Sequence, residues 1–340
     1  MGKRGIALSG NLIVDFYKEI DIYPDHSTLT TIRNINRETG GLVCNCAQGL
    51  SQIDPEFKLA VIGRIGADEA GDFIVEKLSQ YPNIDQSRLI RDGGTSFTDA
   101  MIDLANRTRT YFHFRGANSK LAIEDIDLDH LGVNVLHIGY ILLLDSLDAE
   151  DQEYGTRLAR LLERARKKGI KTSIDIVSEV SDRFSTIVPP ALKYTDYAIV
   201  NEYEASKVTG IPVRDEQGQF LVEAAFEVCR RLLELGVRSL AVIHSREGAV
   251  GISADGARVA LPALEFPREK IVSTIGAGDA FLSGCLYGTC QGYTLEQSIK
   301  LGIAAATTSL SKFNATDGIL PGGQLLDFYD NSAKENWPGF

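Results

Sequence analysis

The chain has 340 residues, of which 44% are hydrophobic and 24% charged, and its formal net charge is −11. This composition is typical of a globular protein with a large buried core, organised as one large domain or two ordinary ones. The excess of acidic residues argues against nucleic-acid binding, because neutralising phosphates requires a basic face.

Membrane insertion is not expected, because no segment reaches the roughly 18 apolar residues of a membrane span. The five cysteines are an odd number in a chain long enough to fold without disulfides, which favours reduced thiols. We therefore expect a cytoplasmic protein with neither a nucleic-acid nor a membrane partner.

Short β-branched runs alternate with helical stretches along most of the chain. A strand at 58–62 precedes a helix near 72–78, and a helix at 156–168 precedes a strand at 171–176. Further buried strands are expected at 134–138, 197–200 and 239–243. This alternation predicts a doubly wound α/β fold, a mostly parallel sheet with helices on both faces. In such sheets the ligand site gathers at the carboxyl ends of the strands.

Two segments, 12–39 and 95–116, depart from this alternation. Both are polar and rich in β-forming residues, without a helical period. We expect them to form a small β-sheet lid, which would exclude water during group transfer. The alternative is an extra hairpin at the edge of the main sheet.

A glycine-rich stretch follows an expected strand at 269–272 and leads into an apolar helix. The amides of Gly276, Ala277 and Gly278 at the start of this helix would favour an anion such as a phosphoryl group. Asp279 is either a base that accepts a proton from an attacking hydroxyl or a first-turn residue that complements the helix dipole. The residues alone leave both interpretations open.

Four motifs carry a resemblance to a known family. They are Thr274-x-Gly-Ala-Gly-Asp-Ala-Phe, Gly40-Gly-Leu-Val-Cys-Asn, Gly63-Arg-Ile-Gly-Ala-Asp-Glu-Ala-Gly and Asn201-Glu-Tyr-Glu. In order and spacing they are similar to the motifs of the ribokinase-like, or PfkB (phosphofructokinase-B), family of carbohydrate kinases. The resemblance implies one kinase domain over 1–340, with ATP and Mg²⁺ as cofactors and with a lid through which a homodimer forms.

The resemblance also implies roles for individual residues. Asp279 would be the general base, and the amides of Gly276 to Gly278 would form the anion hole. Magnesium would be held by Glu204 and Asn201, through water. The sugar would meet Asp15, Gly40, Gly41 and Asn45, and ATP would meet Asn201, Ser245, Gly248, Thr274 and Ile303.

Several positions depart from the family pattern. Ser273 stands where the family usually has an Asp that helps to hold a monovalent cation, so we predict activity that depends little on potassium. Ser245 replaces a glycine of the nucleotide loop near 243–248, and Ile303 replaces an Asn beside adenine. Arg115, where the second lid segment returns to the core, either binds an anionic substrate or forms an ordinary surface ion pair.

The expected activity is transfer of the ATP γ-phosphoryl group to a hydroxyl of a sugar or sugar-like molecule. A nucleoside kinase shares these motifs and is the first alternative, and a non-catalytic sugar or nucleotide sensor on the same fold is the second. The sequence contains no Walker, dinucleotide or zinc-site motif, and its five histidines lie beside no serine or cysteine nucleophile elbow.

Overall fold

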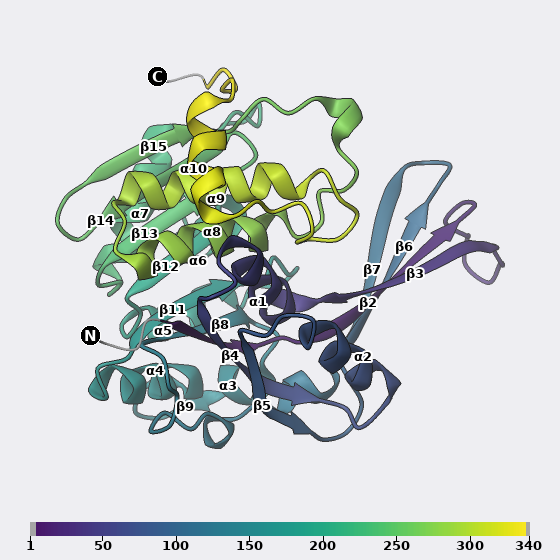
Figure 1. The fold of residues 1–340 in the computed structure, drawn as a ribbon, viewed down its shortest axis with the longest axis horizontal. Helices are drawn as coiled ribbons and strands as arrows, with labels where there is room; N and C mark the ends of the chain where they lie inside the picture. Colours follow the sequence, from purple (N-terminus) through teal and green to yellow (C-terminus); the bar gives the residue numbers. More distant parts are fainter. Residues whose placement is uncertain (1–4, 338–340) are drawn as a thin grey trace.

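A computed structural model describes residues 5–337, and its largest element is a nine-stranded sheet in the order β15-β14-β13-β12-β11-β8-β1-β4-β5 (Figure 1). Neighbours are parallel from β5 to β13, and β14 and β15 are antiparallel. The strands are β1 (Gly5–Gly10), β4 (Lys58–Ile65), β5 (Ile84–Arg91), β8 (Val135–Ile141), β11 (Lys171–Ile176), β12 (Tyr197–Asn201), β13 (Leu240–His244), β14 (Gly248–Ser253) and β15 (Arg258–Pro262).

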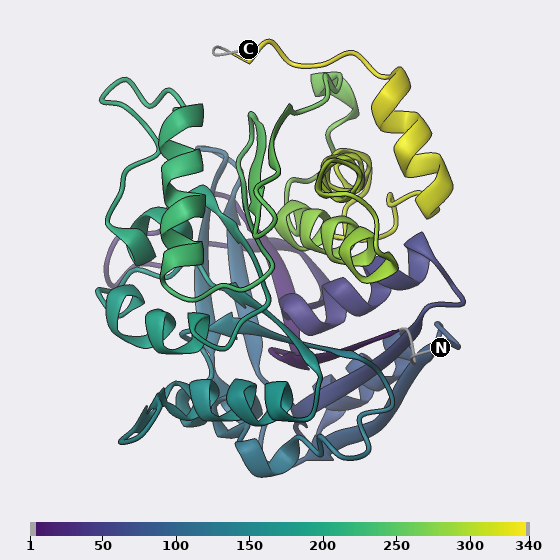
Figure 2. The same ribbon diagram turned by 90° about the vertical axis from the view of Figure 1, so that its left-hand side faces the viewer.

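Helices cover both faces of this sheet, each over its own apolar core (Figure 2). One face carries α1 (Gly41–Ile53), α2 (Glu69–Leu78), α8 (Ala277–Gln291), α9 (Leu295–Ser309) and α10 (Gly322–Asn331). The other carries α3 (Asp145–Asp148), α4 (Arg157–Lys167), α5 (Phe184–Leu192), α6 (Glu202–Thr209) and α7 (Val222–Glu234). The predicted doubly wound α/β fold is confirmed.

Helix α4 illustrates how local sequence sets these elements. Thr156 caps the helix, because its side chain accepts a hydrogen bond from the amide of Ala159. The buried side chains recur with the helical period, so one stripe faces the sheet while the arginines and lysines face water. These buried residues are Leu158, Ala159, Leu161, Leu162 and Ala165.

A second, four-stranded sheet projects from the body of the molecule (Figure 1). Its order is β3-β2-β6-β7, with β2 (Ile13–Ile20) and β3 (Ile32–Gly40) from the first predicted lid segment. The second segment supplies β6 (Phe97–Asp103) and β7 (Thr108–Phe114). The two segments meet through the parallel pair β2 and β6. They therefore form a separate small sheet rather than an edge hairpin. A short two-stranded ladder joins β9 (Glu150–Asp151) to β10 (Gly155–Thr156).

The prediction of a strand at 269–272 is wrong. The chain forms a short 3₁₀ turn over Arg268–Lys270 and then continues without regular structure to α8. Three consecutive charged residues cannot be buried inside a sheet, and Val272 is 57% exposed. The amide of Val272 instead donates to the carbonyl of Leu310, after α9.

The carboxyl ends of the parallel strands meet at one edge of the main sheet, next to the small sheet. The predicted domain covers 1–340, so its first four and last three residues lie outside the described residues. Within 5–337, none of the helices is both long and apolar enough to cross a bilayer.

Candidate active site

A cavity of about 810 Å³ lies along the carboxyl edge of the main sheet, between the small sheet and the starts of α1 and α8. A second cavity of about 440 Å³ adjoins it on the side of β13, α8 and α9. The two share the residues Asn201, His244, Thr274 and Gly278. Two ligands bound side by side would therefore meet at the start of α8.

The first turn of α8 separates the two cavities. Gly276 precedes the helix with φ of 74°, and a Cβ atom there would lie 2.0 Å from the Cβ of Ala315. Only glycine fits this position without strain. Gly276 and Gly278 line the larger cavity, and Ala277 and Gly278 line the smaller one. The start of α8 and the positive end of its helix dipole thus face the point where the cavities meet, although the amide of Ala277 donates to the carbonyl of Thr274 at 3.5 Å.

Asp279 lies in this first turn and lines the larger cavity, although only 6% of its surface is exposed. Its Oδ2 accepts a hydrogen bond from Asn45 Nδ2 at 2.7 Å. The Tyr140 hydroxyl donates to both carboxylate oxygens, at 2.7 Å from Oδ1 and 2.9 Å from Oδ2. Desolvation raises the pKa of Asp279, and the hydrogen bonds from Asn45 and Tyr140 oppose that rise. A carboxylate in this setting can accept a proton from a bound hydroxyl.

The predicted acceptor end is built where β3 runs into α1. Asp15 on β2 lines the cavity, and desolvation raises its pKa to about 7 despite hydrogen bonds from Tyr17 and Thr98. A Cβ atom on Gly40 would lie 2.0 Å from Oδ2 of Asp15, so a side chain there would displace the carboxylate.

Helix α1 brings the next predicted acceptor residues into the same wall. Gly41, at φ of 76°, lets the chain turn beside the carbonyl of Asn11 and begin the helix. One turn later, α1 carries Asn45 into the cavity.

Two further carboxylates face the same cavity. Asn201 caps α6 and binds Glu204 reciprocally, while Glu204 Oε1 also accepts from the hydroxyl of Ser178 at 2.8 Å. Asp175 ends β11. Desolvation raises the pKa of both carboxyl groups, and the charge of Glu204 raises that of Asp175 further. Such a cluster of oxygen donors suits a hard divalent cation. Within residues 5–337, no three His, Cys, Asp or Glu side chains are arranged to hold a metal directly.

The smaller cavity contains the residues predicted near the nucleotide. Ser245 lies in the turn after β13, Gly248 begins β14, and Thr274 and Ile303 line the same space. Apolar walls from Phe281, Leu310 and Ile303 suit a flat ring. His244 stacks on Phe281 with ring centroids 4.7 Å apart, and desolvation lowers its pKa to about 4.

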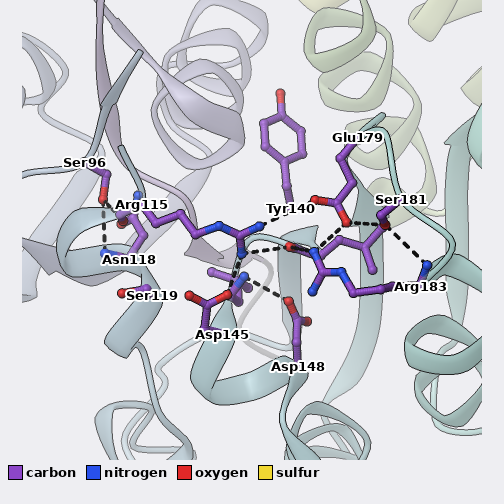
Figure 3. A network of polar contacts seen from close by, with 12 residues as sticks. Ser96, Arg115, Asn118, Ser119, Tyr140, Asp145, Asp148, Glu179, Ser181 and Arg183 are labelled. Carbon is purple, nitrogen blue, oxygen red and sulfur yellow. Dashed lines mark hydrogen bonds and ion pairs between the residues drawn. The ribbon is translucent and has the colours of Figure 1, made fainter. Parts of the chain in front are cut away.

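Arg115, like Gly40, is a predicted site residue that lines neither cavity. Its guanidinium lies between Asp145 and Glu179 and also donates to the carbonyl of Leu142 at 3.1 Å (Figure 3). Arg183 binds the same carbonyl and the same Glu179. Of the two interpretations offered above, the structure therefore favours the ion pair.

Several residues of the cavity walls were missed in the sequence. Arg109 faces the larger cavity together with Tyr111 and His113, and this alternation along β7 was a readable signal. Asp175 lies at the carboxyl end of the strand predicted at 171–176, which is also a readable position. His244 lies within the nucleotide loop predicted near 243–248 but was not named as a site residue. Tyr140 has no local signal that distinguishes it from other strand residues.

Comparisons with known proteins agree with this geometry. The model of the pfkB family carbohydrate kinases matches residues 5–321. The 5-dehydro-2-deoxygluconokinase of Clostridium perfringens is 23% identical over 98% of this chain and 95% of the relative. An uncharacterized sugar kinase of Archaeoglobus fulgidus is 26% identical over 80% of this chain and 98% of its own.

Solved structures show the same fold. Ribokinase of Arabidopsis thaliana complexed with ribose and ATP superposes with a TM-score of 0.76 at 19% identity, covering 97% of this chain and 99% of the other. The 2-dehydro-3-deoxygluconokinase of Thermotoga maritima gives 0.75 at 18% identity, covering 96% and 99%. Since the family match spans nearly the whole chain and the relatives are named as sugar kinases, the chain belongs to the pfkB family of carbohydrate kinases, phosphotransferases with an alcohol group as acceptor.

Proposed function

We propose that the protein transfers the γ-phosphoryl group of ATP to a hydroxyl of a sugar, with Asp279 as general base. The observation that carries this proposal is the place of Asp279, buried at the start of a helix where two cavities meet. The acceptor would occupy the larger cavity beside Asp15 and Asn45, and ATP the smaller one. The amides of Gly276 to Gly278 would stabilise the negative charge on the transferred group.

The carboxylate cluster supports a role for Mg²⁺. Glu204, oriented by Asn201 and Ser178, and the neighbouring Asp175 would hold the ion through water molecules. When bound, Mg²⁺ neutralises charge on the phosphate oxygens. The ion would also offset the charge repulsion that adds to desolvation, from Glu204 and Asp279 on Asp175 and from Asp279 on Glu204, in raising the pKa values of these carboxyl groups.

Within the sugars, we propose a sugar acid as the acceptor. Arg109 lines the larger cavity, and residues 5–337 provide no ion pair for its guanidinium, whereas Arg115 and Arg183 are already paired. The histidines His113 and His244 have lowered pKa values because they are desolvated, so they are neutral at pH 7. A carboxylate on the acceptor would give Arg109 its partner. The names of the relatives, which denote kinases of gluconate derivatives, support the same class.

The small sheet is proposed to act as a lid and as a dimer contact. It supplies cavity residues on one face, among them Asp15 and Arg109, and exposes apolar side chains elsewhere. Burying these side chains against a second copy would remove them from water. Sedimentation at several protein concentrations would measure the dimer. The exposed residues are Ile32, Ile35, Leu104, Phe112 and Phe114.

The test is ADP release with a panel of sugars, sugar acids, sugar phosphates and nucleosides. We expect the highest kcat/KM with a sugar acid, and a loss of roughly 10- to 100-fold with that acceptor in Arg109→Gln. Arg33→Gln is the matched control, because Arg33 lies on the same sheet but is paired with Asp21. Turnover confined to nucleosides would support the nucleoside kinase instead, and binding without turnover would support the sensor.

A further inference from the structure

The phenol of Tyr140 is the closest hydroxyl to the proposed base, yet it comes from a distant part of the chain. Tyr140 lies near the end of β8 and faces the larger cavity, 139 positions from Asp279. Its hydroxyl is 2.7 Å from Oδ1 and 2.9 Å from Oδ2. We propose that Tyr140 is a positioning residue for phosphoryl transfer, which holds the Asp279 carboxylate so that Oδ1 takes the acceptor's proton.

The distribution of donors over the carboxylate supports the choice of oxygen. A carboxylate can accept about four hydrogen bonds. Oδ2 receives Asn45 Nδ2 at 2.7 Å as well as a share of the Tyr140 hydroxyl, whereas Oδ1 receives only the other share. Oδ1 therefore keeps more of its accepting capacity. The terminal torsion of an aspartate is soft, so its plane is fixed only by such partners.

The two donors, Asn45 and Tyr140, come from separate elements that can move independently. Asn45 is carried by α1, which continues the small sheet, and Tyr140 is carried by β8 in the centre of the main sheet. Tyr140 thus ties the base to the rigid sheet, while Asn45 ties it to the lid side. Without the phenol, the carboxylate could rotate about its remaining partner.

The hydroxyl of Tyr140 also affects the pKa of Asp279. Burial raises the pKa of Asp279, and only hydrogen bonds from Asn45 and Tyr140 counter it. Within residues 5–337, Arg109 lines the same cavity but makes no hydrogen bond to this carboxylate. The other ionisable groups around Asp279 are acidic or neutral, so none replaces the lost donor. These groups are Asp15 on β2, Cys46 on α1, Asp175 on β11, Glu204 on α6 and the neutral His244 on β13.

The proposal rests on the proposed function and is tested on the full-length enzyme with Tyr140→Phe, which removes the hydroxyl and keeps the ring. We expect kcat to fall about 10- to 100-fold with the KM for ATP nearly unchanged. The acid limb of the kcat/KM profile should move to higher pH, because a carboxylate that loses a donor is harder to ionise. Tyr287→Phe is the matched control, since Tyr287 on α8 donates to Asp54 at 3.0 Å, away from both cavities.

A second variant protects the test against misfolding. Fluorinated tyrosine placed at position 140 by amber suppression keeps the shape and strengthens the donor, so the acid limb should move to lower pH. Unchanged kcat and unchanged limbs in both Tyr140 variants would overturn the positioning role. A loss of kcat without any shift of the limb, equalled by Tyr287→Phe, would also overturn it. Absence of wild-type turnover with the whole acceptor panel would instead refute the proposed function.

Discussion

Replacing Asp279 by Asn separates the chemical role of this residue from its structural role. The amide keeps the size of the carboxylate, and its oxygen can still accept from Asn45 while its NH₂ group donates to the Tyr140 oxygen. Both hydrogen bonds survive, but the proton acceptor is lost. General-base catalysis contributes about 100- to 10,000-fold, so kcat should fall by that factor while ATP affinity stays nearly constant.

The stability of the same variant provides a second measurement. The native pKa of Asp279 is raised above its ordinary value of 3.8, so the native state binds this proton more tightly than the unfolded chain. The wild-type protein therefore loses stability as pH rises from about 4 through the native pKa. The neutral amide lacks this cost, so we expect a Tm at pH 7.5 equal to or above that of the wild type.

The assay compares initial rates of ADP release and thermal unfolding for the wild type, Asp279→Asn and Asp148→Asn. Asp148 is the matched control, because it is a buried carboxyl with a pKa raised by desolvation to about 7, outside both cavities. It should keep its turnover after substitution. Wild-type turnover in Asp279→Asn would refute the role of the base. If the Tm of Asp279→Asn falls by more than roughly 3 °C, the loss exceeds that of one hydrogen bond. That result would refute the claim that the amide keeps both hydrogen-bond partners.

Four other predictions follow from the site. Asp15→Ala should raise the KM for the acceptor by roughly 10-fold or more and leave the KM for ATP unchanged. Glu204→Gln should instead raise the Mg²⁺ concentration needed for half-maximal rate. If Asp15→Ala weakens the binding of both substrates equally, this division of roles is contradicted. Because the pKa of Asp15 is about 7, the acceptor KM should rise as pH falls below that value, and a flat profile from pH 6 to 8 speaks against an ionised Asp15 in binding. Replacing potassium by a bulky organic cation at constant ionic strength should change the rate less than about tenfold, and Ser273→Asp should gain potassium activation, since serine supplies no charge to hold the ion. Gly276→Ala should lower both Tm and kcat, because its Cβ would lie 2.0 Å from that of Ala315 and φ is 74°; unaltered kcat would show that the anion hole tolerates displacement.

Much of the fold could be predicted because its signals are local. The strand expected at 171–176 is β11 within the same bounds, and the helix expected at 156–168 is α4 to within one residue at each end. The glycines before Asp279 are also a local signal, and they indicated a helix that begins with accessible backbone amides. The strand expected at 269–272 failed because its two apolar residues were weighed without the three charges before them.

The walls of the site could be predicted only in part, because they depend on pairs far apart in sequence. Nothing beside Tyr140 in its apolar strand indicates that its hydroxyl meets Asp279. Arg115 was correctly located at the return of the small sheet, but its partners Asp145 and Glu179 come from two later segments. Ion pairs of this kind become visible only when the chain is folded.

The position of β1 has a consequence for the order in which the protein can be assembled. This first strand is buried along its whole length, and its two edges pair with β4 and with β8, which begins at Val135. During synthesis one edge of this mostly apolar strand must wait for that later segment to leave the ribosome. Exposed edges of this kind invite pairing with other chains. Slow, non-local closure of the sheet should therefore make expression yield depend on temperature and on chaperones.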